Sequence, residues 1–206
     1  MEDLRKIKSK ELLKEAFWRV LEKKLYTQIF IKDVAEEAGV NRKTFTSHYE
    51  NVDALMRDCI GGLFDQLRLF FAYRHPDGSP DFARSTREYT RFALKNRQRL
   101  QLVFHNRLDS VALHLWKEAM IVPETSSIIF PTPAPNLYPA ALPEATAADN
   151  ALRHDLYLNY AIYSCWGNLL WVLEHADLPE EKLVGEALDV FRIYLKDYYS
   201  YYEQTS

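Results

Sequence analysis

The stretch Ile31–Leu55, IKDVAEEAGVNRKTFTSHYENVDAL, decides the fold of this chain. Its first apolar residues recur at helical spacing, and Gly39 then stands where a helix end needs a residue that accepts positive φ. Val40 follows as an apolar plug, and a second short helix is predicted over Arg42–Tyr49. A helix, a glycine turn and a short helix are typical of a helix-turn-helix, whose second helix lies in the major groove of DNA.

Helical periodicity extends over most of the remaining sequence. The first helix is predicted from Leu4 to Lys24, and Asn51 caps a longer helix that runs to Phe71. The turn-forming residues 75–80 end this part of the chain. Further helices are predicted over 82–94, 97–104 and 107–121, and from residues 149 and 179 onward. The predicted fold class is therefore all-α.

Composition favours one large or two small globular domains. Hydrophobic residues make up 48% of the 206 residues, and six glycines are too few for an all-β fold with many tight turns. The charged first residues lack the apolar core of a signal peptide. Two cysteines do not form a disulfide framework, so a cytoplasmic location is expected.

Charge is divided unequally along the chain. The net charge is −3, yet residues 1–58 contain 12 Lys and Arg residues and 11 Asp and Glu residues. A DNA contact must therefore depend on the placement of cations rather than on bulk charge. Arg5, Lys6, Lys8 and Lys10 crowd the start of the first helix, where cations oppose the helix dipole. Either a phosphate contact or a solvated, frayed helix end explains this cluster.

Three segments of the C-terminal half stand out. Residues 122–148 contain six prolines among apolar residues, which predicts an irregular lid or loop. Residues 156–173 carry no charge over 18 positions, the lower limit for a membrane span. Asn159 and Asn168 inside this run favour instead a buried helix that a second subunit partly covers. The final helix repeats apolar residues at spacings of four and three, which suits packing against a second chain or within one chain.

With this order of elements the chain resembles the tetracycline-repressor (TetR) family of transcription regulators. The resemblance lies in IKDVAEEAGV (31–40), NRKTFTSHY (41–49) and NVDALM (51–56), which follow an amphipathic first helix. It implies a helix-turn-helix DNA-binding domain over 1–50 and a helical ligand-binding and dimerisation domain over 51–206. It also implies a homodimer, formed by the last two helices, that binds a palindromic double-stranded DNA operator and leaves it when a small-molecule effector binds.

The resemblance assigns roles to the residues of the motif. Asn41 caps the recognition helix, residues 42–44 face base edges or phosphates, and Phe45 packs into the core. Physically, Arg and Lys donate well to O6 and N7 of guanine. His48 either reaches a phosphate or bridges two helices, and Tyr49 either closes the small core or touches the DNA backbone. The candidate DNA-binding residues are Thr27, Lys32, Asn41, Arg42, Lys43, Thr44, Thr46, His48 and Tyr49.

Three positions depart from the family's pattern. Phe30 replaces the Ser or Thr that caps the second helix, a loss of about 1 kcal/mol that Asp33 partly offsets. Thr46 replaces a tyrosine that contacts phosphate, and Val52 replaces a lysine. Each lost phosphate contact lowers the salt slope of DNA binding by about 0.9.

The ligand-binding and dimerisation residues are less specific in sequence. A pocket for an unidentified effector is expected within residues 80–202, and the candidate lining residues are Phe92, Phe104, Trp116, Tyr163 and Trp166. The same aromatic residues also suit an ordinary core. The candidate dimer interface consists of Trp166, Leu170, Leu188, Phe191, Leu195 and Tyr198. Arg84, Arg87, Arg91 and Lys95 share one helix face, which is either a solvated surface or a site for an anionic effector.

No catalytic or metal site is predicted. The six histidines include no pair at helical ligand spacing, and Cys59 and Cys165 lie far apart. The sequence contains no glycine-rich phosphate loop and no nucleophile motif. An enzyme, a cofactor and a resident metal are therefore not expected.

The sequence thus favours a DNA-binding transcription regulator, a repressor released by a ligand. The first alternative is a protein-interaction module that has kept the fold and lost specific DNA binding. The second is a membrane-attached helical protein, which rests on residues 156–173 alone. A strong salt dependence of DNA binding favours the regulator over the interaction module.

Overall fold

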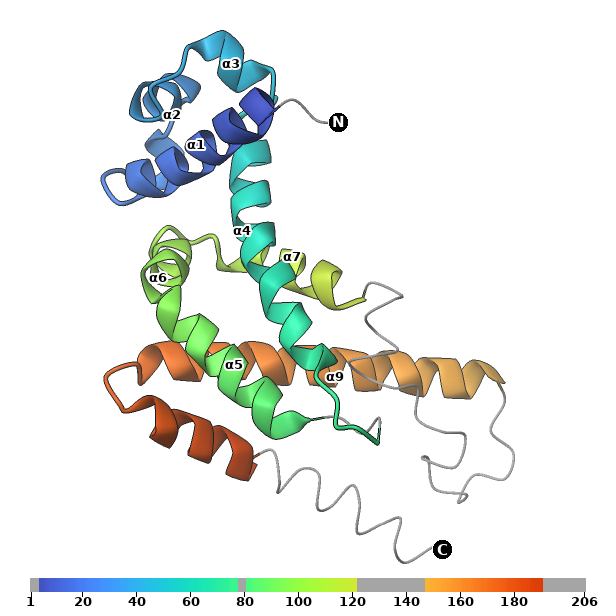
Figure 1. The fold of residues 1–206 in the computed structure, drawn as a ribbon. Coiled ribbons are helices and arrows are strands. Elements are labelled where there is room, and N and C mark those ends of the chain that lie inside the picture. The colour runs from blue at the N-terminus through green and yellow to red at the C-terminus, as the bar shows by residue number, and fades with distance from the viewer. Residues whose placement is uncertain (1–3, 78–80, 122–146, 191–206) are drawn as a thin grey trace, which may run out of the picture. The chain divides into compact units, whose positions relative to one another are not determined.

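The computed structural model describes residues 4–77, 81–121 and 147–190, and the elements of these ranges are helices (Figure 1). In chain order these are α1 (Leu4–Leu21), η1 (Tyr26–Gln28), α2 (Ile31–Glu37), α3 (Arg42–Thr46), α4 (Val52–Leu69), η2 (Phe70–Ala72), α5 (Phe82–Lys95), α6 (Arg97–His105), α7 (Asp109–Ile121), α9 (Ala147–Glu174) and a helix over 180–190. The all-α fold class is thereby confirmed for the described ranges. Most of the proline-rich segment 122–148 lies outside them.

The chain forms two compact units. The first comprises Met1–Asp65 and Gln98–Trp116, so α6 and the first part of α7 pack with the N-terminal helices. The second comprises Gln66–Arg97 and Lys117–Ser206. The domain boundary predicted after residue 50 separates the helix-turn-helix from the rest of the chain. This boundary stays a prediction.

The core of the first unit is built on one face of α1. This face packs against α2, and α2 packs against α3. Phe64 of α4 meets Trp116 of α7 edge to face, with ring centres 5.7 Å apart. Burial of each such side chain stabilises the fold by roughly 1.5–3 kcal/mol. The buried residues of α1, which include the face predicted from the sequence, are Leu13, Ala16, Phe17, Trp18, Val20 and Leu21.

The second unit is centred on the packing of α5 against α9. The hydroxyl of Tyr89 donates to the backbone carbonyl of Cys165 at 2.8 Å and joins the two helices, which cross at an angle (Figure 1). Arg91 of α5 reaches Glu180 at 2.9 Å, which ties α5 to the start of the last described helix. The buried residues that fill this core from α9 and the last described helix are Ile162, Trp166, Leu169, Val172, Leu173, Leu183, Val184 and Ala187.

Two predicted helix ends are wrong for local reasons. The amides of Lys23 and Lys24 both bond to the carbonyl of Val20, so the chain turns and α1 stops at Leu21 instead of residue 24. Helix α3, predicted to be the recognition helix, stops at residue 46 instead of 49. There the hydroxyl of Ser47 donates to an α3 carbonyl at 2.7 Å and competes with further helical bonding.

The start of α7 is also later than predicted, at Asp109 instead of residue 107. Arg107 has a φ of 57°, the left-handed conformation that usually falls to glycine at a helix end. The amide of Arg107 bonds to Phe104 and that of Leu108 to Val103, at 3.0 and 2.9 Å. This bonding ends α6 and redirects the chain, and no glycine marks the position in the sequence.

Candidate nucleic-acid interface

The turn between α2 and α3 has the backbone that the sequence predicts. Gly39 has a φ of 67°, and a Cβ at this position would meet nothing within 4 Å. The requirement for glycine is therefore conformational rather than steric. The amide of Gly39 bonds to Glu36 at 3.1 Å and that of Val40 to Ala35 at 2.9 Å, which closes the end of α2.

Helix α3, predicted to be the recognition helix, begins at a side-chain cap. The Oδ1 atom of Asn41 accepts hydrogen bonds from the amide of Thr44 at 2.8 Å and from its hydroxyl at 3.1 Å. The predicted capping role of Asn41 is thus present. Arg42 and Lys43 follow at the first two positions of α3, both exposed, and neither belongs to an ion pair with a described residue.

Phe45 anchors α3 to the rest of the unit. Its side chain is 0% exposed, and its ring lies 6.0 Å from that of Tyr49. A five-residue helix has little stability of its own, because helix nucleation is costly. The orientation of Arg42 and Lys43 therefore depends on the burial of Phe45.

A cavity of about 380 Å³ opens beside the end of α3. It is lined by Lys6, Ile7, Lys10 and Glu11 of α1 and by Ser47 and His48. The Nε2 atom of His48 and the hydroxyl of Ser9 are 2.7 Å apart, so His48 bridges α1 and the end of the recognition helix. This contact joins α1, next to the N-terminal basic cluster, to the residues that follow α3.

Asp58 of α4 connects this helix with α1 and with the loop that follows α3. Its carboxylate lies 3.0 Å from the Lys10 ammonium and 3.2 Å from that of Lys14, and it accepts a hydrogen bond from the Tyr49 hydroxyl at 2.7 Å. Burial works against ionisation of Asp58, but the hydrogen bonds from Tyr49 and Lys10 outweigh it and lower its pKa. Burial and the bond to Asp58 raise the pKa of Tyr49, so its hydroxyl remains a donor near neutral pH.

Asp58 is expected to make the free energy of unfolding of the first unit depend on pH. Because its pKa is lower in the folded chain than the unfolded value of about 3.9, ionised Asp58 stabilises the fold above that value. This contribution is lost as pH falls through the folded pKa. Urea unfolding at pH values from 7 to about 3 should show wild type more stable than Asp58→Asn at neutral pH and the difference shrinking below about pH 4. A difference that stays constant over this range would exclude an ionic origin.

A neighbouring residue compensates for the side-chain cap that Phe30 does not provide at the start of α2. Phe30 is 61% exposed and caps nothing with its side chain. Instead, the carboxylate of Asp33 accepts from the Phe30 amide at 2.9 Å and pairs with Lys24 at 2.8 Å. The bond from Lys24, followed by that from Phe30, lowers the pKa of Asp33. The offset predicted for Asp33 is therefore a hydrogen bond as well as a dipole effect.

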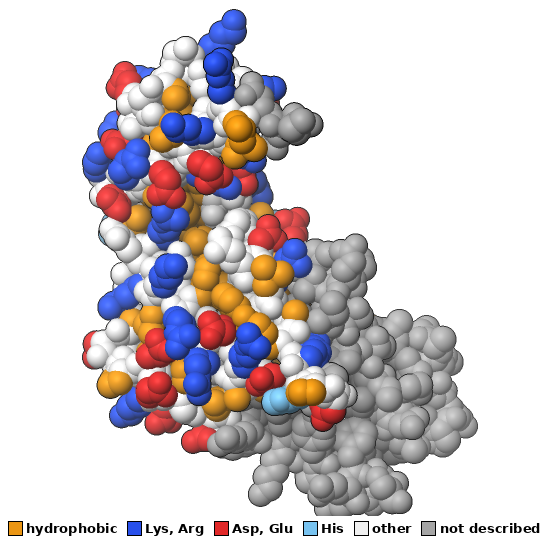
Figure 2. All heavy atoms as spheres, in the orientation of Figure 1, with side chains coloured by type: hydrophobic (Ala, Val, Ile, Leu, Met, Phe, Trp, Pro, Cys, Tyr) orange, Lys and Arg blue, Asp and Glu red, His pale blue; other side chains and the backbone are white. Residues whose placement is uncertain are grey.

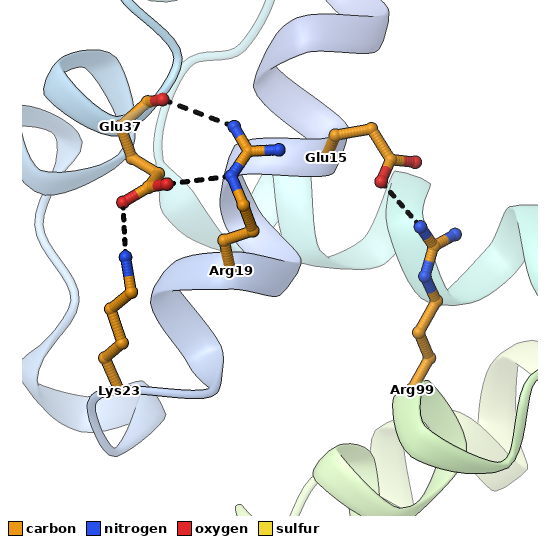
Figure 3. Close-up of polar contacts among 5 residues, drawn as sticks. All are labelled: Glu15, Arg19, Lys23, Glu37 and Arg99. Atoms are coloured by element: carbon orange, nitrogen blue, oxygen red, sulfur yellow. Dashed lines mark hydrogen bonds and ion pairs between the residues drawn. The ribbon is translucent and has the colours of Figure 1, made fainter.

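Ion pairs fix α2 and α6 to α1 (Figure 3). Glu37, at the end of α2, accepts from Arg19 and Lys23 at 2.7 Å each, and Arg19 also reaches the Glu37 carbonyl at 3.3 Å (Figure 3). Arg99 of α6 reaches Glu15 of α1 at 2.6 Å. Since these pairs lie at the solvent-accessible surface, each contributes little stability. They restrict the angle at which α2 and α6 meet α1.

The candidate DNA-binding residues are thus not equally placed. Tyr49 is 6% exposed and belongs to the core. Thr44 and His48 are half-buried. Of the two roles considered for His48, the structure contains the bridging contact, to Ser9 of α1. The hydroxyl of Thr46 donates to the Lys43 carbonyl of its own helix at 3.2 Å. The exposed candidates are Thr27, Lys32, Asn41, Arg42, Lys43 and Thr46. On the face drawn in Figure 2, cations are interspersed with acidic side chains.

Ser9, Asp58 and Glu37 were not predicted from the sequence to be residues of this site. Lys10 and Lys14 stand one helical turn apart, which places both amines on one face of α1 and was the available signal for a carboxylate partner. Ser9 and Glu37 had no comparable signal, because their contacts depend on the angle between helices.

The candidate ligand residues fall in both units. Phe104 and Trp116 belong to the first unit and Phe92, Tyr163 and Trp166 to the second. Phe92, Trp116 and Trp166 are buried, whereas Tyr163 is 48% exposed. In the second unit the Thr90 hydroxyl is buried and has no hydrogen-bond partner among the described residues. The assignment of the five aromatic residues to an effector pocket stays a prediction.

The basic face of α5 is partly used within the chain. Arg91 pairs with Glu180 and Glu88, and the Arg84 guanidinium lies 4.0 Å from the centre of the Tyr73 ring. These contacts favour an ordinary helix face over a binding site for an anionic effector.

The dimer residues can be located only in part. Trp166 is buried and Leu170 and Leu188 are half-buried, while Phe191, Leu195 and Tyr198 lie outside the described residues. Among the described helices none is long and apolar enough to cross a membrane. The described residues also contain no group of three side chains arranged to hold a metal ion.

Comparison with known proteins gives a structural likeness. No protein-family model matches the chain, and no curated protein matches its sequence. Among solved structures, the dihydroxyacetone kinase operon activator DhaS matches with a TM-score of 0.51 and 15% sequence identity, over 91% of this chain and 98% of that protein. At this identity the likeness concerns the fold, and the chain shares the helical fold of DhaS.

Proposed function

We propose that this chain is a DNA-binding transcription regulator that reads its operator with the start of α3. The proposal rests on Arg42 and Lys43, two exposed cations without an ion-pair partner among the described residues. Cations at a helix start oppose the dipole, so the stability of α3 does not explain them. Their side chains suit guanine O6 and N7. The fold shared with DhaS, an operon activator by name, supports the same role.

The cavity beside α3 extends this surface toward the DNA backbone. Lys6 lines it together with His48, and Lys10, although paired with Asp58, stands at the same wall. Phosphate oxygens accept from such donors, and these contacts fix register without reading sequence. We infer that α1 holds a phosphate next to the bases that α3 reads.

We further infer a TetR-like homodimer, assembled through α9 and the helix that follows it, on a palindromic operator. A small molecule that binds the second unit releases the DNA by favouring one spacing of the two reading heads, in proportion to its differential affinity. Helix α4 contributes residues to both units and is the proposed lever. DhaS is named as an activator, so reporter expression with and without this chain decides between repression and activation.

A protein-interaction module is the second candidate. It is favoured by Tyr49, which lies in the core, and by Thr46, whose hydroxyl bonds to its own helix. Two positions that would touch phosphate are thereby engaged elsewhere.

Selection of bound sequences from a random double-stranded DNA library tests the proposal. The full chain is expected to recover a palindromic motif, and the logarithm of its affinity should fall linearly with the logarithm of salt concentration, by about 0.9 per phosphate contact. Recovery of no motif by folded, dimeric protein would reject the regulator and favour the interaction module.

A further inference from the structure

One cation of the second unit is held by neutral groups. The ammonium of Lys117, on α7, donates to the amide oxygen of Asn159 on α9 at 3.2 Å. The same ammonium lies 5.4 Å from the centre of the Tyr163 ring. Asn159 and Tyr163 stand one turn apart on α9, and both face Lys117. None of the ion pairs among the described residues includes Lys117.

Neighbouring contacts hold this arrangement in place. The Nδ2 atom of Asn159 donates to the backbone carbonyl of Asp155 at 2.8 Å, which turns the amide oxygen toward Lys117. Lys117 and Asn159 are half-buried, so the ammonium has lost part of its hydration. An amide oxygen and a ring face stabilise a cation less than a carboxylate does. An ammonium has three donors, of which the described residues use one in a hydrogen bond.

The chemistry of the cluster selects a class of ligand. A single Lys charge matches a monoanion better than a phosphate, which carries nearly two charges near pH 7. The Lys117 ammonium lies over one face of the Tyr163 ring, and because Tyr163 is about half exposed, the rest of its aromatic surface is open to stacking or edge contact. A small aromatic carboxylate satisfies both groups, because its carboxylate accepts from Lys117 while its ring lies against Tyr163.

We propose that Lys117, Asn159 and Tyr163 bind small aromatic carboxylates and that such a compound is the effector of this regulator. Lys117 neutralises the carboxylate, Asn159 positions the ammonium and Tyr163 contacts the ring. The word effector rests on the proposed function, whereas binding of the carboxylate does not.

Isothermal titration of the full chain with benzoate and 1-naphthoate, each paired with its neutral amide, tests the binding. At least one carboxylate should bind roughly tenfold or more tightly than its amide, as expected for a hydrogen bond to a charged group. Lys117→Gln should abolish this preference and Lys117→Arg should retain most of it. Absence of binding by both carboxylates, equal binding of acid and amide to wild type, or an unchanged preference in a folded Lys117→Gln variant would overturn the proposal. The acid–amide comparison on wild type needs no variant, so it holds even if Lys117→Gln fails to fold.

A second arm separates this proposal from the proposed function. The carboxylate that binds is added to the complex of the chain with its selected DNA site, and DNA release is followed by anisotropy. Release by the carboxylate and not by the amide is the expected result. Binding without release would overturn the effector role and leave the carboxylate site intact. A chain that binds carboxylate but recovers no DNA motif would overturn the proposed function instead.

Discussion

Alanine replacement of Arg42 and Lys43 together is expected to weaken operator binding by about 30-fold or more. Each side chain that reaches a base edge contributes roughly 1–3 kcal/mol of discrimination. The loss should be accompanied by relaxed preference at the bases that the two residues read. Binding isotherms on the selected site at several salt concentrations measure both effects.

The matched control removes two cations of the same kinds elsewhere. Arg87 and Lys95 are exposed on α5 in the second unit, and their double alanine variant changes net charge by the same amount. If affinity depends on placement, this control binds like wild type at physiological salt. Equal losses in both double variants would indicate an effect of bulk charge, and no loss in the α3 variant would remove Arg42 and Lys43 from the interface.

Replacing Phe45 by alanine is expected to destabilise the chain by about 3–4 kcal/mol, the cost of deleting a fully buried aromatic ring. The ring is 0% exposed and is the buried residue of α3. With so short a helix, its loss also removes the surface that presents Arg42 and Lys43, so DNA binding should fall with stability. Urea unfolding followed by circular dichroism gives the free energy.

Phe30→Ala provides the matched control for this cost. The same type of side chain is truncated at the residue that precedes α2 of the same motif, but Phe30 is 61% exposed. The expected change is within about 0.5 kcal/mol. If the two variants lost similar free energy, the packing of α3 through Phe45 would not be what holds the helix-turn-helix together.

Features set by local sequence were predictable. Gly39 has the positive φ that its place after an apolar helix requires, and Asn41 and Asn51 each accept from the amide three residues on. These outcomes depend on a few neighbouring residues and on backbone chemistry that every chain shares. The buried face of α1 followed from helical periodicity alone.

Contacts between helices were not predictable from the same signals. Two roles were predicted for His48 and for Tyr49, and the contacts that decide between them come from other helices, Ser9 of α1 for His48 and Asp58 of α4 for Tyr49. The start of α7 was predicted two residues too early because Arg107 adopts a conformation that the sequence signals only through glycine. The effector and dimer residues stay predictions, since their roles require a ligand and a second chain.

The Asp58 cluster has an evolutionary consequence. Two lysines serve one carboxylate, so loss of either Lys10 or Lys14 leaves a cation in place, whereas loss of Asp58 leaves two amines and the Tyr49 hydroxyl without their acceptor. The tolerance to mutation is therefore asymmetric. One lysine can therefore be replaced at a time, and replacement of Lys10, which also lines the cavity beside α3, would change the charge of that cavity while Lys14 still pairs with Asp58. The redundancy of the pair thus lets the lining of the cavity change while Asp58 keeps a cationic partner.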